Sequence, residues 1–138
     1  SKYGGERQSR GRREAAMMAL KDLADSLGNE NVIAMGDFND TPDAVSFRII
    51  DGTLVNLGAD LHERGEGTIR YEGKWDLIDM FMVSPSLSER VEMEVCRVPF
   101  LMTWERNHAG EKPLRTYSGP RYIGGVSDHC PIILKIYH

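Results

Sequence analysis

Polar side chains that could perform hydrolytic chemistry stand next to apolar stretches at three separate places in the sequence. Asp37 and Asn39 follow one apolar run, and Asp79 interrupts a second run. Asp128 and His129 stand immediately before a third. Burying charged or polar groups costs free energy unless they bind one another or hold a metal ion. The pattern therefore predicts that these side chains meet in one site.

Three carboxylates, an amide and an imidazole suit the hydrolysis of a phosphate ester. Oxygen ligands favour a hard cation such as Mg²⁺, which neutralises phosphate charge. A carboxylate can orient the attacking water, an imidazole can act on the phosphoryl oxygens, and an amide can stabilise the transition state. Each group alone has an ordinary alternative, because a single Asp often protects a strand edge and a single His is usually structural. The hypothesis depends on the three places converging.

An amphipathic helix is predicted over residues 9–27, where apolar residues recur at spacings of four, three and four before Gly28. The beginning of this helix is rich in arginine, including Arg7, Arg10 and Arg13. The helix dipole is already positive there, so the arginines indicate an anionic group nearby. The alternative is a basic helix end that simply faces solvent.

Two further elements are predicted on either side of Asp37. The apolar run at residues 32–35 is typical of a strand buried on both faces. A capping threonine followed by proline and an acidic residue predicts a short helix over residues 42–50. Asp37 and Asn39 would then lie in a strand-to-helix turn, where a rigid framework holds accessible polar groups.

The rest of the chain is predicted to consist mainly of strands. Two strands are predicted within residues 67–83, on either side of a turn at 72–73, and the second of them covers 77–83. Two further strands are predicted over residues 91–98 and 131–137. Residues 99–126 show no periodicity and contain several prolines and glycines. A long functional loop or an insertion is therefore predicted in that segment.

Length and composition are those of one globular domain or of a part of one. The chain has 138 residues, of which 41% are apolar and 28% are charged, and its net charge is -4. The acidic charge argues against a protein that coats nucleic acid through bulk electrostatics, although a local basic patch could still contact phosphates. No apolar run is long enough to span a membrane. The two cysteines are far apart, which indicates neither a zinc site nor a disulfide framework.

Three sequence motifs resemble the C-terminal signatures of the endonuclease/exonuclease/phosphatase superfamily, the deoxyribonuclease-I-like enzymes. They are "GDFND", "WDLIDMFMVS" and "GGVSDHCPI", in the order in which the superfamily has them. The resemblance implies that Asp37 orients or activates the attacking water and that Asn39 stabilises the transition state. It also implies that Asp79 supports the imidazole of His129, that His129 contacts the scissile phosphate, and that Asp128 contributes to a metal site. The opening segment "SKYGGERQSRGRREAA" also resembles a superfamily segment next to the site, which implies that Arg7, Arg10 and Arg13 bind the substrate.

The resemblance covers residues 1–138 but corresponds only to the second half of a superfamily domain. It implies an α+β fold in which a β-sheet is flanked by helices, about half of a four-layer α/β/β/α sandwich. The other half would supply an Asn, a metal-binding Glu and a second catalytic His. One sheet of a two-sheet sandwich would leave an apolar face uncovered. We therefore expect self-association, binding to a complementing N-terminal half, or only marginal stability.

The predicted function is divalent-metal-dependent hydrolysis of phosphate esters, with Mg²⁺ as the expected cofactor and Mn²⁺ as the alternative. The rival hypothesis is a binding or assembly module that retains the fold without turnover. The segment 99–126 mixes basic and aromatic residues, which can stack on bases and bind phosphates. It can equally cover a smaller substrate. Nucleic acid, phospholipid, inositol phosphate and small phosphate esters therefore all stay open as substrates, and so does the compartment.

Overall fold

The computed structural model describes residues 6–28 and 30–138, which form a mixed α+β fold. The helical elements are α1 (Glu6–Leu27), η1 (Val45–Ile50), α2 (Ala59–Glu63), α3 (Pro85–Ser88) and η2 (Pro99–Leu101). The strands are β1 (Ile33–Asp37), β2 (Val55–Asn56), β3 (Ile69–Tyr71), β4 (Lys74–Asp76), β5 (Asp79–Val83), β6 (Val91–Val95), β7 (Met102–Glu105), β8 (Gly110–Pro113), β9 (Tyr117–Ser118), β10 (Arg121–Tyr122) and β11 (Ile132–Ile136). No described helix is both long enough and apolar enough to cross a membrane.

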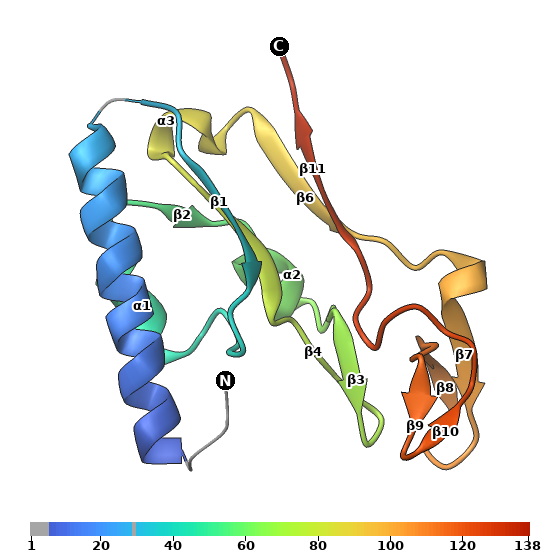
Figure 1. The fold of residues 1–138 in the computed structure, drawn as a ribbon. Coiled ribbons are helices and arrows are strands. Elements are labelled where there is room, and N and C mark those ends of the chain that lie inside the picture. The colour runs from blue at the N-terminus through green and yellow to red at the C-terminus, as the bar shows by residue number, and fades with distance from the viewer. Residues whose placement is uncertain (1–5, 29) are drawn as a thin grey trace.

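Strand β5 is the centre of the largest sheet, which has the order β1-β5-β2 with antiparallel pairing. Helix α1 lies along one side of this sheet, and the antiparallel pair β6–β11 lies on the other side (Figure 1). Three two-stranded ladders, β3–β4, β7–β8 and β9–β10, extend toward one end of the molecule (Figure 1). The α+β fold class predicted from the sequence is therefore confirmed.

The hydrophobic core forms between α1, η1 and the sheet. Phe81 and Met82 on β5 point to opposite faces of the strand and are both buried, so both faces of this central strand are covered. Met17 from α1 and Phe47 from η1 pack in the same cluster. Burial of this apolar surface is the main favourable contribution to folding, and it fixes β5, whose first residue is Asp79.

The prediction that residues 32–35 are buried on both faces is wrong for this chain. Val32 and Ala34 pack against the core, whereas Ile33 is 41% exposed and Met35 is 72% exposed. Strand β1 lies at the edge of its sheet, and no described element covers its outer face. An apolar groove of about 630 Å³ consequently runs between α1 and β1.

Three other sequence predictions need correction. The short helix at 42–50 is a 3₁₀ helix that begins at Val45, because Thr41 bonds the side chain of Asp43 instead of capping a helix backbone. The turn at 72–73 is confirmed, but its second strand is β4, and β5 joins another sheet. Residues 99–126 are not a loop, since they form η2 and the ladders β7–β8 and β9–β10.

The turn at Glu72 and Gly73 has positive φ angles of 48° and 82°. Two consecutive residues of this kind are typical of the tight turn that joins two twisted antiparallel strands. A Cβ atom on Gly73 would lie 2.9 Å from Cβ of His108, which belongs to the connection between β7 and β8. Glycine therefore serves both the turn and the close approach of two hairpins.

Arg70 ties these two hairpins together. Its side chain is 7% exposed, and its guanidinium donates to the carbonyl of His108 at 2.7 Å and lies 3.2 Å from Glu105. Lys112 also binds Glu105, at 3.0 Å. Charge-assisted contacts between partly buried groups are stronger than surface ion pairs. They fix the β7–β8 hairpin next to β3, which leads into the candidate site.

Candidate active site

Asp37 and Asp79 face one another across neighbouring strands. Asp37 is the last residue of β1 and Asp79 is the first residue of β5, and the two are direct cross-strand partners. The backbone of Phe38 continues the connection by donating to the carbonyl of Ile78 at 2.8 Å. Like charges placed directly opposite destabilise a sheet. The chain thus maintains an unfavourable carboxylate pair at this sheet end, which is typical of a functional site.

His129 reaches the same place from another part of the chain. It does not arrive through a shared sheet, since β11 pairs with β6 rather than with β5. Instead, His129 forms an isolated antiparallel bridge with Ile69, and the Cys130 N–H donates to the carbonyl of Thr68 at 2.7 Å. The three segments therefore do not share one sheet, and their polar residues converge nevertheless.

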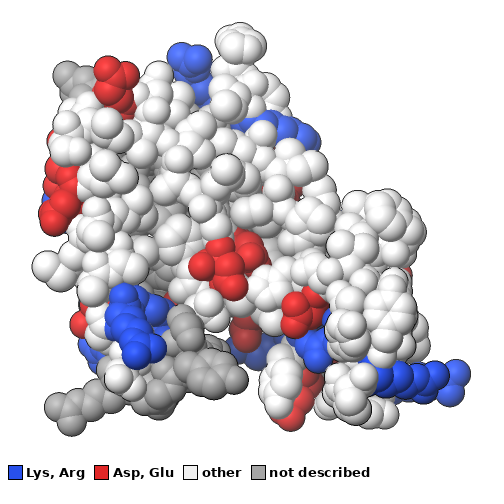
Figure 2. Space-filling view, in the orientation of Figure 1, with Lys and Arg blue, Asp and Glu red and all other residues white. Residues whose placement is uncertain are grey.

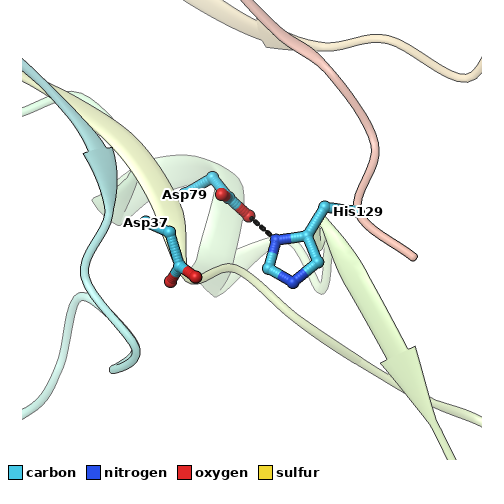
Figure 3. Close-up of side chains that lie close together, drawn as sticks. All are labelled: Asp37, Asp79 and His129. Carbon is cyan, nitrogen blue, oxygen red and sulfur yellow. Dashed lines mark hydrogen bonds and ion pairs between the residues drawn. The ribbon is translucent and has the colours of Figure 1, made fainter. Parts of the chain in front are cut away.

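Asp37, Asp79 and His129 form one compact cluster (Figure 3). Nδ1 of His129 lies 2.8 Å from Oδ2 of Asp79. One potential ligand atom from each of the three side chains lies within 4.8 Å of the other two. The cluster combines two carboxylates with an imidazole, and its carboxylate oxygens suit a hard divalent cation.

Asp79 raises the pKa of His129 above its usual value of 6.5, mainly by accepting the hydrogen bond from the imidazole. Partial burial acts in the opposite direction, and the negative charges of Asp79, Asp128 and Asp37 raise the pKa further. A carboxylate that binds one imidazole nitrogen also fixes the orientation of the ring. The geometry therefore supports a positioned imidazole of increased basicity.

We expect the pKa of His129, measured by NMR titration in chelator-treated buffer, to lie above 6.5 and to fall in an Asp79→Asn variant. Because the folded-state pKa exceeds the unfolded value, this interaction stabilises the fold fully below about pH 6.5. That stabilisation is lost as the pH rises through the folded-state pKa. An unchanged titration midpoint in Asp79→Asn would contradict the assignment of the main cause.

Asn39 and Asp128 lie at the margin of the cluster. The backbone N–H of Asn39 donates to Oδ1 of Asp37 at 2.8 Å, and Asn39 has a positive φ of 53°. Asp128 Oδ1 lies 4.0 Å from Nε2 of His129, while its Oδ2 lies 3.2 Å from Arg115. The side chain of Asp128 is 47% exposed and already holds a cationic partner. The structure thus places the predicted metal ligand beside the three-residue cluster.

The predicted substrate-binding arginines occupy different positions. Arg13 lies 2.8 Å from Asp40, which follows Asn39 in the same loop, so Arg13 adjoins the cluster. Arg10 pairs with Glu14 one helical turn away and is 60% exposed. The side chain of Arg7 lies outside the described part of the structure. Figure 2 shows acidic side chains near the middle of this face, with basic side chains below them on both sides.

Sequence reasoning missed one polar residue that contacts the cluster. Thr68 is fully buried and donates its hydroxyl hydrogen bond to Oδ2 of Asp79 at 2.5 Å. Threonine is common in strands, so its type gives little warning of such a role. The one available signal was that Thr68 lies in the first of the two strands predicted within residues 67–83, while Asp79 lies in the second.

The comparison with protein families agrees with the kind of chemistry that this cluster of carboxylates and imidazole suits. The sequence model of the Endonuclease/Exonuclease/phosphatase family matches residues 1–138, and the chain therefore belongs to this family. Members of the family are generally hydrolases that act on phosphate esters, and they generally use divalent metal ions. No match was found among curated proteins or among solved structures.

Proposed function

We propose that the chain carries the hydrolytic centre of a divalent-metal-dependent phosphoric ester hydrolase. The observation that supports this most is the convergence of Asp37, Asp79 and His129 from three separate segments. Two carboxylates placed directly opposite one another repel and so cost stability, an arrangement that is common at functional sites. Its presence in a family of phosphate-ester hydrolases favours catalysis over a purely structural role.

In this proposal each side chain performs one task. Asp37 orients or deprotonates the attacking water, and Asn39 stabilises the crowded transition state without adding negative charge. Asp79 holds Nδ1 of His129, which leaves Nε2 of the ring for the scissile phosphate. Arg13 adds positive charge near the loop that carries Asn39, and the exposed Arg10 would contact outlying anionic parts of the substrate. We propose the same substrate-binding role for Arg7, which precedes Arg10 by three positions in the sequence.

The donor set fits a hard divalent ion such as Mg²⁺, with Mn²⁺ as the alternative. Asp37 supplies carboxylate oxygens, and Asp128 can contribute once its contact with Arg115 loosens. One oxygen of Asp79 is already engaged by the hydrogen bond from His129. When bound, such an ion neutralises phosphate charge and lowers the pKa of a coordinated water.

The direct test is hydrolysis of a substrate panel containing single- and double-stranded DNA, a lipid phosphodiester, an inositol phosphate and a sugar phosphate. We expect turnover with Mg²⁺ for at least one class, loss of turnover with excess chelator, and recovery when Mg²⁺ is added back. Turnover that is unaffected by the chelator would contradict the metal-dependent mechanism. Binding of a substrate without any turnover would favour the binding-module alternative.

We further propose that the apolar groove between α1 and β1 is covered in the functional protein, either by a second copy or by a complementing N-terminal half. The groove exposes Leu23, Leu27, Ile33 and Met35. Contiguous exposed apolar surface of this kind is typical of an interface. Size-exclusion chromatography with light scattering is expected to show self-association of the 138-residue chain. A stable monomer that binds no hydrophobic dye would contradict this proposal.

A further inference from the structure

We propose that Thr68 is a positioning residue for the proposed hydrolytic reaction and acts through Asp79 on His129. Thr68 is fully buried and immediately precedes β3. Its hydroxyl contacts Oδ2 of Asp79, the same oxygen that binds Nδ1 of His129. This inference rests on the proposed function and names the group that holds the carboxylate in place.

The direction of the Thr68 hydrogen bond follows from its other neighbours. The backbone N–H groups of Ile78 and Asp79 both donate to Oγ1 of Thr68, each at 3.3 Å. A hydroxyl has one hydrogen to donate and two lone pairs to accept with. Because both lone pairs receive N–H donors, the hydroxyl hydrogen is directed to the Asp79 carboxylate. The threonine therefore acts as a donor with a fixed direction.

This arrangement specifies the protonation pattern of His129. An ionised carboxylate only accepts hydrogen bonds, so Oδ2 of Asp79 requires a hydrogen on Nδ1 of His129. In the neutral imidazole, Nε2 then carries the free lone pair. Thr68 keeps Oδ2 at the position where it selects this tautomer. A displaced carboxylate would leave the ring free to rotate or to adopt the other tautomer.

The backbone of Thr68 connects the same groups a second time. Its N–H donates to the carbonyl of Asp76 at 2.9 Å, and its carbonyl accepts from the Cys130 N–H at 2.7 Å. One residue thus contacts the segment before Asp79 and the segment after His129. The backbone contacts persist in any side-chain variant, so substitutions at this position test the hydroxyl separately from the chain path.

Four variants separate the hydroxyl from side-chain volume. Thr68→Val keeps the shape and removes the hydroxyl, Thr68→Ser keeps the hydroxyl and removes the methyl group, and Thr68→Ala removes both. Thr53→Val is a matched control, because Thr53 donates to Asp25 outside the cluster, at 3.3 Å. Circular dichroism and thermal unfolding identify any variant that does not fold.

We expect kcat to fall about 10- to 100-fold in Thr68→Val and Thr68→Ala, with KM changed less than about threefold, since a hydrogen bond to a charged group is lost. Thr68→Ser and Thr53→Val should retain kcat within about threefold. If Thr68→Val does not fold, the comparison of Ser with Ala gives the same contrast at nearly equal volume. Wild-type kcat in a folded variant without the hydroxyl would overturn the proposal, and so would equal losses in Ser and Ala.

An independent readout does not require turnover. Long-range ¹H–¹⁵N spectra of the imidazole report which nitrogen of His129 carries the hydrogen. We expect the Nδ1–H tautomer in the wild type and in Thr68→Ser, and a growing Nε2–H population in Thr68→Val and Thr68→Ala. Identical tautomer populations in all variants would refute the positioning role. If the chain has no hydrolytic activity, the proposed function fails while this spectrum still tests Thr68.

Discussion

Replacing His129 with Ala is expected to lower kcat by about 10²- to 10⁴-fold, the usual contribution of a positioned acid–base group. The imidazole is held by Asp79 at 2.8 Å, and its other nitrogen is directed away from that hydrogen bond. No other histidine belongs to the cluster among the described residues. The variant would therefore lose the group proposed to act on the phosphate, and no neighbouring imidazole stands in for it.

The control for this variant is His138→Ala, because His138 is exposed at the last position of the chain. It should retain wild-type kcat and KM. Exogenous imidazole at high concentration is expected to restore part of the activity of His129→Ala, since the cavity left by the ring is partly open to solvent. Full activity of His129→Ala in folded protein would rule out the assigned role.

Local sequence patterns predict those elements whose environment lies nearby in the chain. The helix predicted over residues 9–27 is confirmed as α1, and Gly28, with a positive φ of 62°, follows its end. The strand predicted over 131–137 is confirmed as β11. The turn at 72–73 is confirmed because its residues suit positive φ angles. In each case the decisive interactions are local or follow directly from burial periodicity.

Elements that depend on distant partners could not be predicted in this way. The residues of the β7–β8 ladder do not alternate cleanly between polar and apolar types, so periodicity does not predict the two strands. The ladder is held partly by the ion pair between Glu105 on β7 and Arg70 on another hairpin, which lies far away in the sequence. The strand after Gly73 ends at Asp76, and the apolar run beyond it enters a different sheet. A continuous apolar pattern does not reveal such a change of partner, since periodicity reports burial and not pairing.

The candidate site was predictable in its residue types and only partly in its geometry. The cost of burying unpaired polar groups predicts a shared site for Asp37, Asp79 and His129, of which Asp79 and His129 are partly buried and Asp37 is exposed. The route by which His129 joins the two carboxylates was not predictable, because it depends on an isolated bridge to Ile69. Thr68 was missed for the same reason, since its role follows from three hydrogen bonds to Oγ1 and not from its residue type.

An Asp37→Asn variant is expected to lower kcat by about 10²- to 10⁴-fold while leaving the melting temperature unchanged or raised. Asn retains an oxygen that can accept the backbone hydrogen bond from Asn39, so the loop geometry should persist. Removing the charge of Asp37 also removes its repulsion with the cross-strand partner Asp79, which favours a higher melting temperature. This gain is largest at a pH where His129 is neutral, because no attraction between Asp37 and a charged imidazole is then lost.

Asp22→Asn, on the exposed surface of α1, is the matched control for Asp37→Asn and should leave both kcat and the melting temperature unchanged. Isothermal titration with Mg²⁺ should show weaker binding to Asp37→Asn than to the wild type, because a neutral amide would replace one of the proposed carboxylate ligands. A structural carboxylate would behave in the opposite way, since its neutralisation would lower stability and leave the chemical step intact. A lower melting temperature with wild-type kcat would therefore show that Asp37 serves the fold, and the proposed hydrolytic centre would lose the residue that prepares its nucleophile.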